Sequence, residues 1–199
     1  MASRITQAAN DQQSMMLRGN ISPRLHRATD QGRLPAATPL SQMALVFRRS
    51  DAQQNALDLL LDQQQDPASL NYHKWLTPEQ FGQRFGLSAA DLSKITNWLQ
   101  ARGFRDIQVA RGLDYVTFDG TAGQVESAFR TQINRYVLDG KSHYANATEP
   151  SIPAAFASVV AGIRSLTDFR PKPRVRVQPK FTSSSSGNHF VAPADFATI

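Results

Sequence analysis

The sequence predicts an α+β fold, in which helices are segregated from an antiparallel sheet. Two observations lead to this prediction. Short apolar segments typical of strands are interspersed with segments that show the periodicity of amphipathic helices. In addition, four Ser or Thr residues suited to helix N-termini are each followed three residues later by a Gln or an Asp that can complete the cap.

The first predicted strand is the apolar segment "MALVF" at residues 43–47. Ser50 then caps a helix, and Gln53 can reach back to complete a capping box. This helix ends at Asp66-Pro67, because the residue before a proline is disfavoured in helical conformation. Its apolar face consists of Ala56, Leu57, Leu60 and Leu61.

Two further helices follow. Thr77 caps the first of them, with Pro78 at the first helical position and Gln80 completing the capping box. Phe81 and Phe85 share one face of it, and Gly86 closes it. Ser88 with Asp91 begins the next helix, which stops at Gly103 and has an apolar face of Leu92, Ile95 and Leu99.

Residues 104–110 and 113–118 are predicted to pair as a β-hairpin through a turn at Arg111-Gly112. Thr121 and Gln124 open a fourth capped helix, whose buried side consists of Val125, Ala128 and Phe129. Residues 135–147 are predicted to form a strand and a turn. A last helix is expected over residues 152–163, with Pro153 near its start.

This order predicts a ferredoxin-like βαββαβ unit, an antiparallel sheet with helices on one face and extra helices. Residues 1–16 are expected to be a flexible N-terminus. Beyond Phe169 the sequence is rich in Pro, basic residues and Ser, which is typical of an extended, exposed linker over residues 170–188. Residues 189–199 are apolar again and are interpreted as the start of a second domain that is cut short.

Composition excludes several classes. The chain has no cysteine, so disulfides and thiol chemistry are excluded. No stretch approaches the roughly 20 apolar residues that span a bilayer, and residues 1–16 lack the apolar core of a signal peptide. No membrane partner is therefore expected, and an exported protein would need a signal that this chain does not show. The net charge of +6 is concentrated in residues 1–40 and 170–180.

The sequence offers little evidence of a catalytic or metal site. His73 and Lys74 precede a predicted helix without a carboxylate partner nearby, so Tyr72, Trp75 and Leu76 are interpreted as apolar anchors of that helix. The four histidines show no metal-ligand spacing. The run of serines at 183–186 lacks the glycine pattern of a nucleophile turn and is interpreted as a spacer. No metal and no cofactor is expected in this chain.

The segment "RGLDYVTF" (111–118) approaches an RNA-binding strand pattern. Leu113 stands where that pattern has a stacking aromatic residue, and Asp114 stands where it has a small one. Base stacking on such strands carries much of the affinity, so the match is weak. A ferredoxin-like module that binds single-stranded RNA with help from the basic tail remains the alternative. The structural interpretation places Val116 and Phe118 toward the core and Leu113 and Tyr115 on the other face.

Three ordered motifs resemble the activation propeptide of the sedolisin, or kumamolisin-type, serine-carboxyl peptidases: "YHKWLTPEQFGQRFG", "GTAGQVESAFRTQI" and "HYANATEPSIP". The resemblance extends from about Leu17, through "LPAATPLSQMALVFRRS", to about Phe169, and defines a propeptide domain over 17–169. "NHFVAPADFATI" resembles the opening of the catalytic domain. The resemblance implies that the His-Lys-Trp-Leu-Thr-Pro stretch is a propeptide signature and takes no part in catalysis.

The resemblance further implies a secreted, monomeric propeptide that packs its sheet on its own sedolisin catalytic domain. It would assist folding, inhibit the peptidase and be removed by proteolysis in acid, with no nucleic acid involved. The calcium site usual in the family belongs to the catalytic domain and is not expected here. The surface expected to meet the peptidase includes Leu113, Tyr115, Tyr136 and Leu138. The processing linker includes Arg174, Val175, Arg176, Val177, Gln178, Pro179 and Lys180.

The family's catalytic residues do not carry over to this sequence. Its nucleophile lies in a Ser-Gly-Thr-Ser motif, whereas this chain has Ser186-Gly187-Asn188. Its catalytic Glu and Asp stand four residues apart, and no Glu here is followed by Asp at that spacing. The chain is therefore expected to be inert by itself.

Overall fold

The computed structural model of the chain describes residues 2–169, 181–182 and 189–190. The chain divides into two compact units, Met1–Phe169 and Arg170–Ile199. In the second unit, β10 (Phe181–Thr182) pairs with β11 (His189–Phe190) as an antiparallel ribbon. The first unit, called the body below, contains the other described helices and strands.

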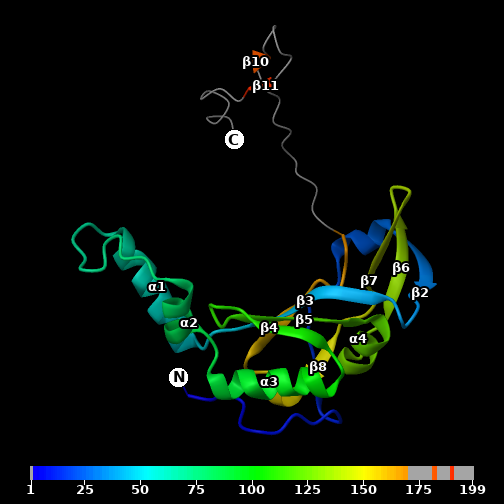
Figure 1. Ribbon diagram of the computed structural model, residues 1–199, viewed down its shortest axis with the longest axis horizontal. Helices are drawn as coiled ribbons and strands as arrows, with labels where there is room; N and C mark the ends of the chain where they lie inside the picture. Colours follow the sequence, from blue (N-terminus) through cyan, green and yellow to red (C-terminus); the bar gives the residue numbers. More distant parts are fainter. Residues whose placement is uncertain (1, 170–180, 183–188, 191–199) are drawn as a thin grey trace. The chain divides into compact units, whose positions relative to one another are not determined.

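The main sheet of the body has four strands in the order β4-β5-β3-β9, and each neighbouring pair is antiparallel (Figure 1). The predicted hairpin over 104–118 is confirmed as the pair β4 and β5. Mixed helices and antiparallel sheets confirm the α+β class. The strands are β3 (Pro39–Phe47), β4 (Arg105–Val109), β5 (Tyr115–Thr121) and β9 (Val160–Arg164).

Helices α3 (Ala89–Ala101) and α4 (Ala122–Phe129) lie on one side of the main sheet (Figure 1). Aromatic rings join the layers: the Trp98 and Phe129 ring centroids are 5.5 Å apart, and those of Phe129 and Phe118 are 6.0 Å apart. The strands meet these helices with Met43, Leu45, Val116 and Phe118, all of which are fully buried. Burial of this apolar area is the main stabilising contribution to the body.

A second sheet has the order β2-β6-β7, formed by β2 (Thr29–Arg33), β6 (Ile133–Leu138) and β7 (Lys141–Asn146). The strand and turn predicted over 135–147 are confirmed, but the turn is followed by a second strand, and the resulting hairpin of β6 and β7 lies outside the main sheet. The inner side of this sheet buries Tyr136 and Ala145 with Phe169. A short 3₁₀ helix, Pro23–Arg27, precedes β2.

The prediction of a helix over residues 152–163 is wrong. This segment forms β8 (Ser151–Pro153), a 3₁₀ turn (Ala154–Phe156) and then β9. Short apolar runs do not separate helix from strand by periodicity, and here pairing with a distant strand decides. Ile163 lies opposite Leu45 of β3, so the segment becomes the edge strand that completes the main sheet.

Residues 1–16 differ from the flexible segment expected from sequence. β1 (Ser14–Met16) pairs antiparallel with β8, and the side chain of Ile5 is 1% exposed in the main core. The physical reason is a local anchor. The carboxylate of Asp91, in the first turn of α3, accepts hydrogen bonds from the backbone of this N-terminal segment.

Asp91 is fully buried and its acceptor capacity is filled. Its Oδ2 accepts from the backbone N–H of Arg4 at 2.8 Å and from Ser88 Oγ at 2.9 Å. Its Oδ1 accepts from the N–H of Ile5 at 2.9 Å and from Ser3 Oγ at 2.5 Å. Burial acts to raise the pKa of Asp91, but these hydrogen bonds together outweigh it and hold the pKa below its usual value.

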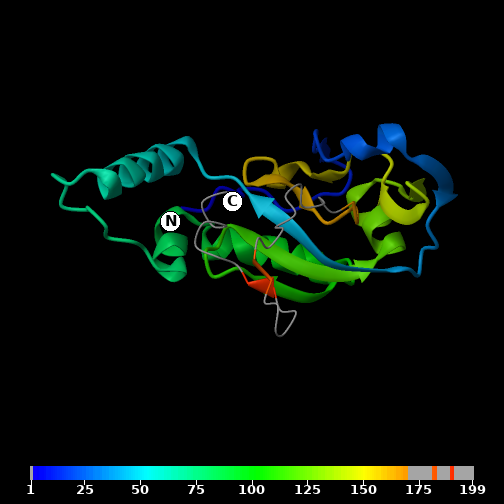
Figure 2. The ribbon, with the colours of Figure 1, turned by 90° about the horizontal axis from the view of Figure 1, so that it is seen from above.

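The predicted helix caps are confirmed. Capping boxes open α1 (Asp51–Gln65), α2 (Pro78–Phe85) and α4, at Ser50, Thr77 and Thr121 respectively. Ser88 Oγ accepts from the backbone N–H of Asp91 at the start of α3. The helices α1 and α2 extend away from the sheets as a separate projection (Figures 1 and 2).

Replacing Asp91 by Asn is expected to lower the free energy of unfolding at pH 7 by about 2–3 kcal/mol, because an amide cannot accept all four hydrogen bonds. The pKa of Asp91 is lowered in the folded state, so its stabilisation is present above the unfolded value near 4 and is lost as pH falls through the folded value. Urea unfolding from pH 7 to pH 2 should show the difference from wild type shrinking. Asp62→Asn, at an exposed site on α1, is the control. A difference independent of pH would contradict this account.

Candidate functional site

The main sheet has one face turned away from α3 and α4 (Figure 1). Register identifies its residues, because directly paired residues share a face. Tyr115 lies opposite Val46, and Thr117 lies opposite Ala44. We call this surface the open face; it consists of Ala44, Val46, Arg105, Gln108, Tyr115, Thr117, Asp119, Gly162 and Arg164.

Tyr115 is the one residue of the four predicted at the interface that lies on the open face, where it is 41% exposed. The residues next to it, Val46, Thr117 and Gly162, are small and uncharged. Charged side chains stand further away on the same face, at Arg164 on the edge strand and at the paired Arg105 and Asp119. Val46 and Thr117, which sequence reasoning missed, are its neighbours across and along the strands. The signal for them was the alternation of residues along "MALVF" in β3 and along "DYVTF" in β5, two strands that pair directly.

Leu113 lies in the turn between β4 and β5, with a φ of 51°. Its side chain packs against the body core, and its carbonyl accepts from the N–H of Leu87 at 2.8 Å. Leu113 and Tyr115 were predicted to share one face of the sheet, but Leu113 does not lie on the open face. The prediction failed because the turn reverses the chain before Tyr115, so strand alternation does not reach back to residue 113.

Tyr136 and Leu138 belong to β6 of the second sheet. Tyr136 is only 5% exposed, and Leu138 packs against the same small cluster. Burial raises the pKa of the Tyr136 hydroxyl, and the nearby Asp30 carboxylate raises it further. The structure does not bring these two residues together with Tyr115. The predicted processing linker, Arg174 to Lys180, lies outside the described residues.

The histidines of the body show no catalytic arrangement. His143 Nδ1 is 3.1 Å from Asp168 Oδ1, and Tyr144 donates its N–H to the same oxygen. His73 stacks on Tyr72 with ring centroids 3.8 Å apart. Among residues 2–169, 181–182 and 189–190, no three His, Asp or Glu side chains gather where they could hold a metal ion.

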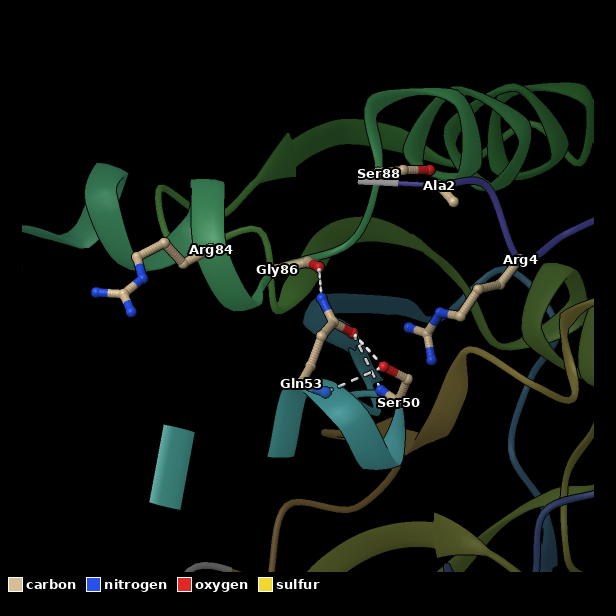
Figure 3. A pocket seen from close by; sticks show the side chains of 7 residues that line it. All are labelled: Ala2, Arg4, Ser50, Gln53, Arg84, Gly86 and Ser88. Carbon is tan, nitrogen blue, oxygen red and sulfur yellow. Dashed lines mark hydrogen bonds between the residues drawn. The ribbon is translucent and has the colours of Figure 1, made fainter. Parts of the chain in front are cut away.

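A cavity of about 320 Å³ lies where the N-terminal segment meets the start of α1 and the end of α2 (Figure 3). The Arg4 guanidinium at its edge donates to the carbonyls of Arg48 and Ser158, and burial lowers the pKa of Arg4. Gln53 spans the cavity wall by donating to the carbonyl of Gly86. The lining residues are Ala2, Arg4, Ser50, Gln53, Arg84, Gly86 and Ser88, a set without an acid and base pair.

The RNA-binding strand pattern loses support from this geometry. Phe118 is fully buried beneath α4, and Leu113 lies in the turn. Tyr115 alone of the pattern's side chains presents an exposed ring on the open face. Stacking platforms for nucleic acids combine several such rings with basic groups, whereas the open face offers a single exposed ring and pairs one of its two arginines, Arg105, with Asp119 across the strands.

The α1–α2 projection contacts the rest of the body at Gly82, within α2, and at Gly86, the C-cap of α2. A Cβ at residue 82 would lie 2.8 Å from the carbonyl oxygen of Arg111, and one at residue 86 would lie 2.5 Å from Leu113 Cβ. The β4–β5 turn therefore packs directly on the backbone of α2. An ion pair between Glu79 and Arg111 supports the same junction.

Fold and site together define an α+β domain in which none of the helices among residues 2–169 covers the open face of the main sheet. A model of the pro-kumamolisin activation domain family matches residues 26–169. The chain therefore belongs to the family of pro-kumamolisin activation domains, which precede sedolisin-type peptidases. The resemblance seen in the sequence motifs is thereby confirmed.

Individual relatives agree with this assignment. The chain is 32% identical over 173 residues to xanthomonalisin from Xanthomonas sp. strain T-22, covering 86% of this chain and 20% of the relative. It is 30% identical over 158 residues to sedolisin from Pseudomonas sp. strain 101, covering 76% of this chain and 26% of the relative. It is 29% identical over 147 residues to tripeptidyl-peptidase 1 of Rattus norvegicus, covering 71% of this chain and 26% of the relative. The chain thus spans a fifth to about a quarter of these relatives. No helix in the described part of the chain has the length and apolar character to cross a membrane.

Gly86→Ala is expected to lower the free energy of unfolding by about 1–3 kcal/mol, because the added methyl group overlaps Leu113 and forces the α2 junction apart. Urea unfolding measures this. Gly162→Ala is the matched control, since its nearest contact would be 3.3 Å, to Asn20 Oδ1. Equal, small effects of the two substitutions would show that the junction tolerates separation.

Proposed function

We propose that this chain is the propeptide of a secreted sedolisin-family serine endopeptidase. In this proposal it assists the folding of the peptidase, inhibits it, and is removed by proteolysis triggered by acid. The observation that carries the proposal is the family match over residues 26–169. These residues include every strand of the main sheet and of the second sheet. The open face supplies the surface for the partner.

The partner in this proposal is the chain's own catalytic domain, bound by a monomeric propeptide. Sheet surfaces with small, uncharged side chains can be covered closely by another protein at little desolvation cost. The open face has this character around Tyr115, whose amphipathic ring is typical of binding hot spots. We further propose that the chain is no enzyme by itself and works without metal or cofactor.

Inhibition and RNA retention together test the proposal. The chain should inhibit its mature cognate peptidase in a fluorogenic substrate assay and should pass through a single-stranded RNA column at about 0.15 M salt. Tight retention on RNA with no effect on the peptidase would support the nucleic-acid-binding alternative instead. Refolding of the unfolded peptidase with and without the chain tests the folding role separately.

Tyr115→Ser is expected to raise the inhibition constant about tenfold or more, because it removes the exposed ring from the centre of the open face. The side chain is 41% exposed, so the fold should tolerate the change. Asn97→Ser, at an exposed position on α3 behind the sheet, is the control. An unchanged inhibition constant for Tyr115→Ser would move the interface to another surface.

The first maturation cuts are expected within residues 170–188, at or near Arg174–Lys180. A protease binds its substrate as an extended chain, and Pro171, Pro173 and Pro179 oppose helix in this segment. Incubation of the chain with mature peptidase at acid pH, followed by mass spectrometry of the fragment ends, maps the cuts. Early cuts inside 50–165, with 170–186 left whole, would show that activation instead destroys the body.

A further inference from the structure

The α1–α2 projection carries an unusual surface. We call residues 51–86 the arm; they comprise α1, the connecting loop and α2, and they extend from the body in both views (Figures 1 and 2). The arm has a small core of its own, in which Leu57 and Leu60 of α1 pack with Phe85 of α2. Leu76 and Phe81 cover this core.

Most of the large apolar side chains that the described residues expose belong to the arm. Leu70 is 88% exposed and Trp75 is 65% exposed, values well beyond those of ordinary surface residues of these types. Of the three residues interpreted as apolar anchors of α2, Leu76 packs on the core of the arm, whereas Tyr72 and Trp75 are exposed. We call the exposed set the arm surface; it consists of Leu59, Leu61, Leu70, Tyr72 and Trp75.

The loop that carries this surface is held in place by hydrogen bonds. The side chain of Gln64, which is buried, donates to the carbonyl of Lys74, and the carbonyl of Gln64 accepts from the N–H of His73. Asn71 Nδ2 donates to Gln63 Oε1 at 2.8 Å. A loop fixed in this way presents its side chains without a further ordering cost on binding.

The aromatic side chains of the loop form a stacked row. The ring of His73 lies 3.8 Å from that of Tyr72 and 6.0 Å from that of Trp75, centroid to centroid. His73 adopts a φ of 53°, an uncommon conformation for a residue with a side chain, and its N–H bond to Gln64 holds it there. The row leaves the outer parts of Tyr72 and Trp75 accessible.

The arm also has a defined position relative to the open face. Its junction with the β4–β5 turn is close, because Gly82 and Gly86 admit the backbone of residues 111–113. In Figure 1, α3 lies below the main sheet, whereas the free end of the arm rises on the opposite side, the side of the open face. A single large partner resting on the open face could therefore also contact the arm.

We propose that the arm surface is a second docking surface for the sedolisin-type catalytic domain, separate from the open face. This proposal rests on the proposed function. The chain covers only 20% to 28% of its relatives, so a much larger remaining part is available to cover the arm surface. Exposed apolar patches rimmed by polar residues mark such interaction sites, and a rigid Trp is the side chain that most often anchors them.

Inhibition of the mature cognate peptidase tests the arm surface. Trp75→Ser and Leu70→Ser should each raise the inhibition constant about tenfold, with unchanged urea unfolding because both side chains are exposed. Met16→Ser is the matched control, since Met16 is 56% exposed on β1, outside the arm, and should leave inhibition unchanged. In a complex with a peptidase whose nucleophile is replaced, amide hydrogen exchange over residues 66–76 should slow.

The outcomes separate the two proposals. Failure of the wild-type chain to inhibit would contradict the proposed function. Inhibition by wild type, with both arm variants within twofold of it and no added exchange protection at 66–76, would overturn the arm surface alone. Concentration-dependent dimerisation of the isolated chain in sedimentation, abolished by Trp75→Ser, would assign the arm surface to a second copy and likewise overturn the proposal.

Discussion

The pairing of β3 with β9 is the constraint on which the body depends. β3 lies between β5 and β9 in the main sheet, and its partner residues in β9 are more than a hundred positions further along the chain. Closing so long a loop costs conformational entropy, which burial of Leu45 and Ile163 against the helices has to offset. Strands β6 and β7 of the second sheet and helix α4 lie within this loop, so the same closure constrains their positions.

The parts of the fold that local chemistry decides could be predicted from the sequence. Ser50, Thr77 and Thr121 cap their helices through groups only three residues away, and the β4–β5 hairpin joins neighbouring segments. Residues 152–163 could not be predicted in this way, because their strand conformation is set by β3. The ordered N-terminus likewise depends on Asp91, a residue of a distant helix whose carboxylate had looked like an ordinary part of a cap.

The candidate site shows the same division. Tyr115 was found because alternation along a single strand places its side chain on the face away from the buried Val116 and Phe118. Tyr136 was misplaced because the sequence does not show that its strand belongs to a second sheet with Phe169 beneath it. Trp75 was interpreted as an apolar anchor because it directly precedes a capped helix, but it is 65% exposed. Whether such a ring faces inward depends on the backbone conformation of the loop. Here hydrogen bonds between Gln64 and the backbone of His73 and Lys74 fix that conformation.

The body is complete at Phe169, whose ring packs with Tyr136 and Ala145. A cut in the chain beyond this residue leaves the contacts of that cluster in place, so it would release a folded domain with its binding surfaces intact. Under the proposed function, such a cut changes only the physical link: a catalytic domain that was tethered at high effective concentration becomes a separate molecule held by non-covalent contacts. Loss of the bond alone would then not liberate the partner. On that proposal the severed pair would stay together in a confined compartment and would dissociate on dilution.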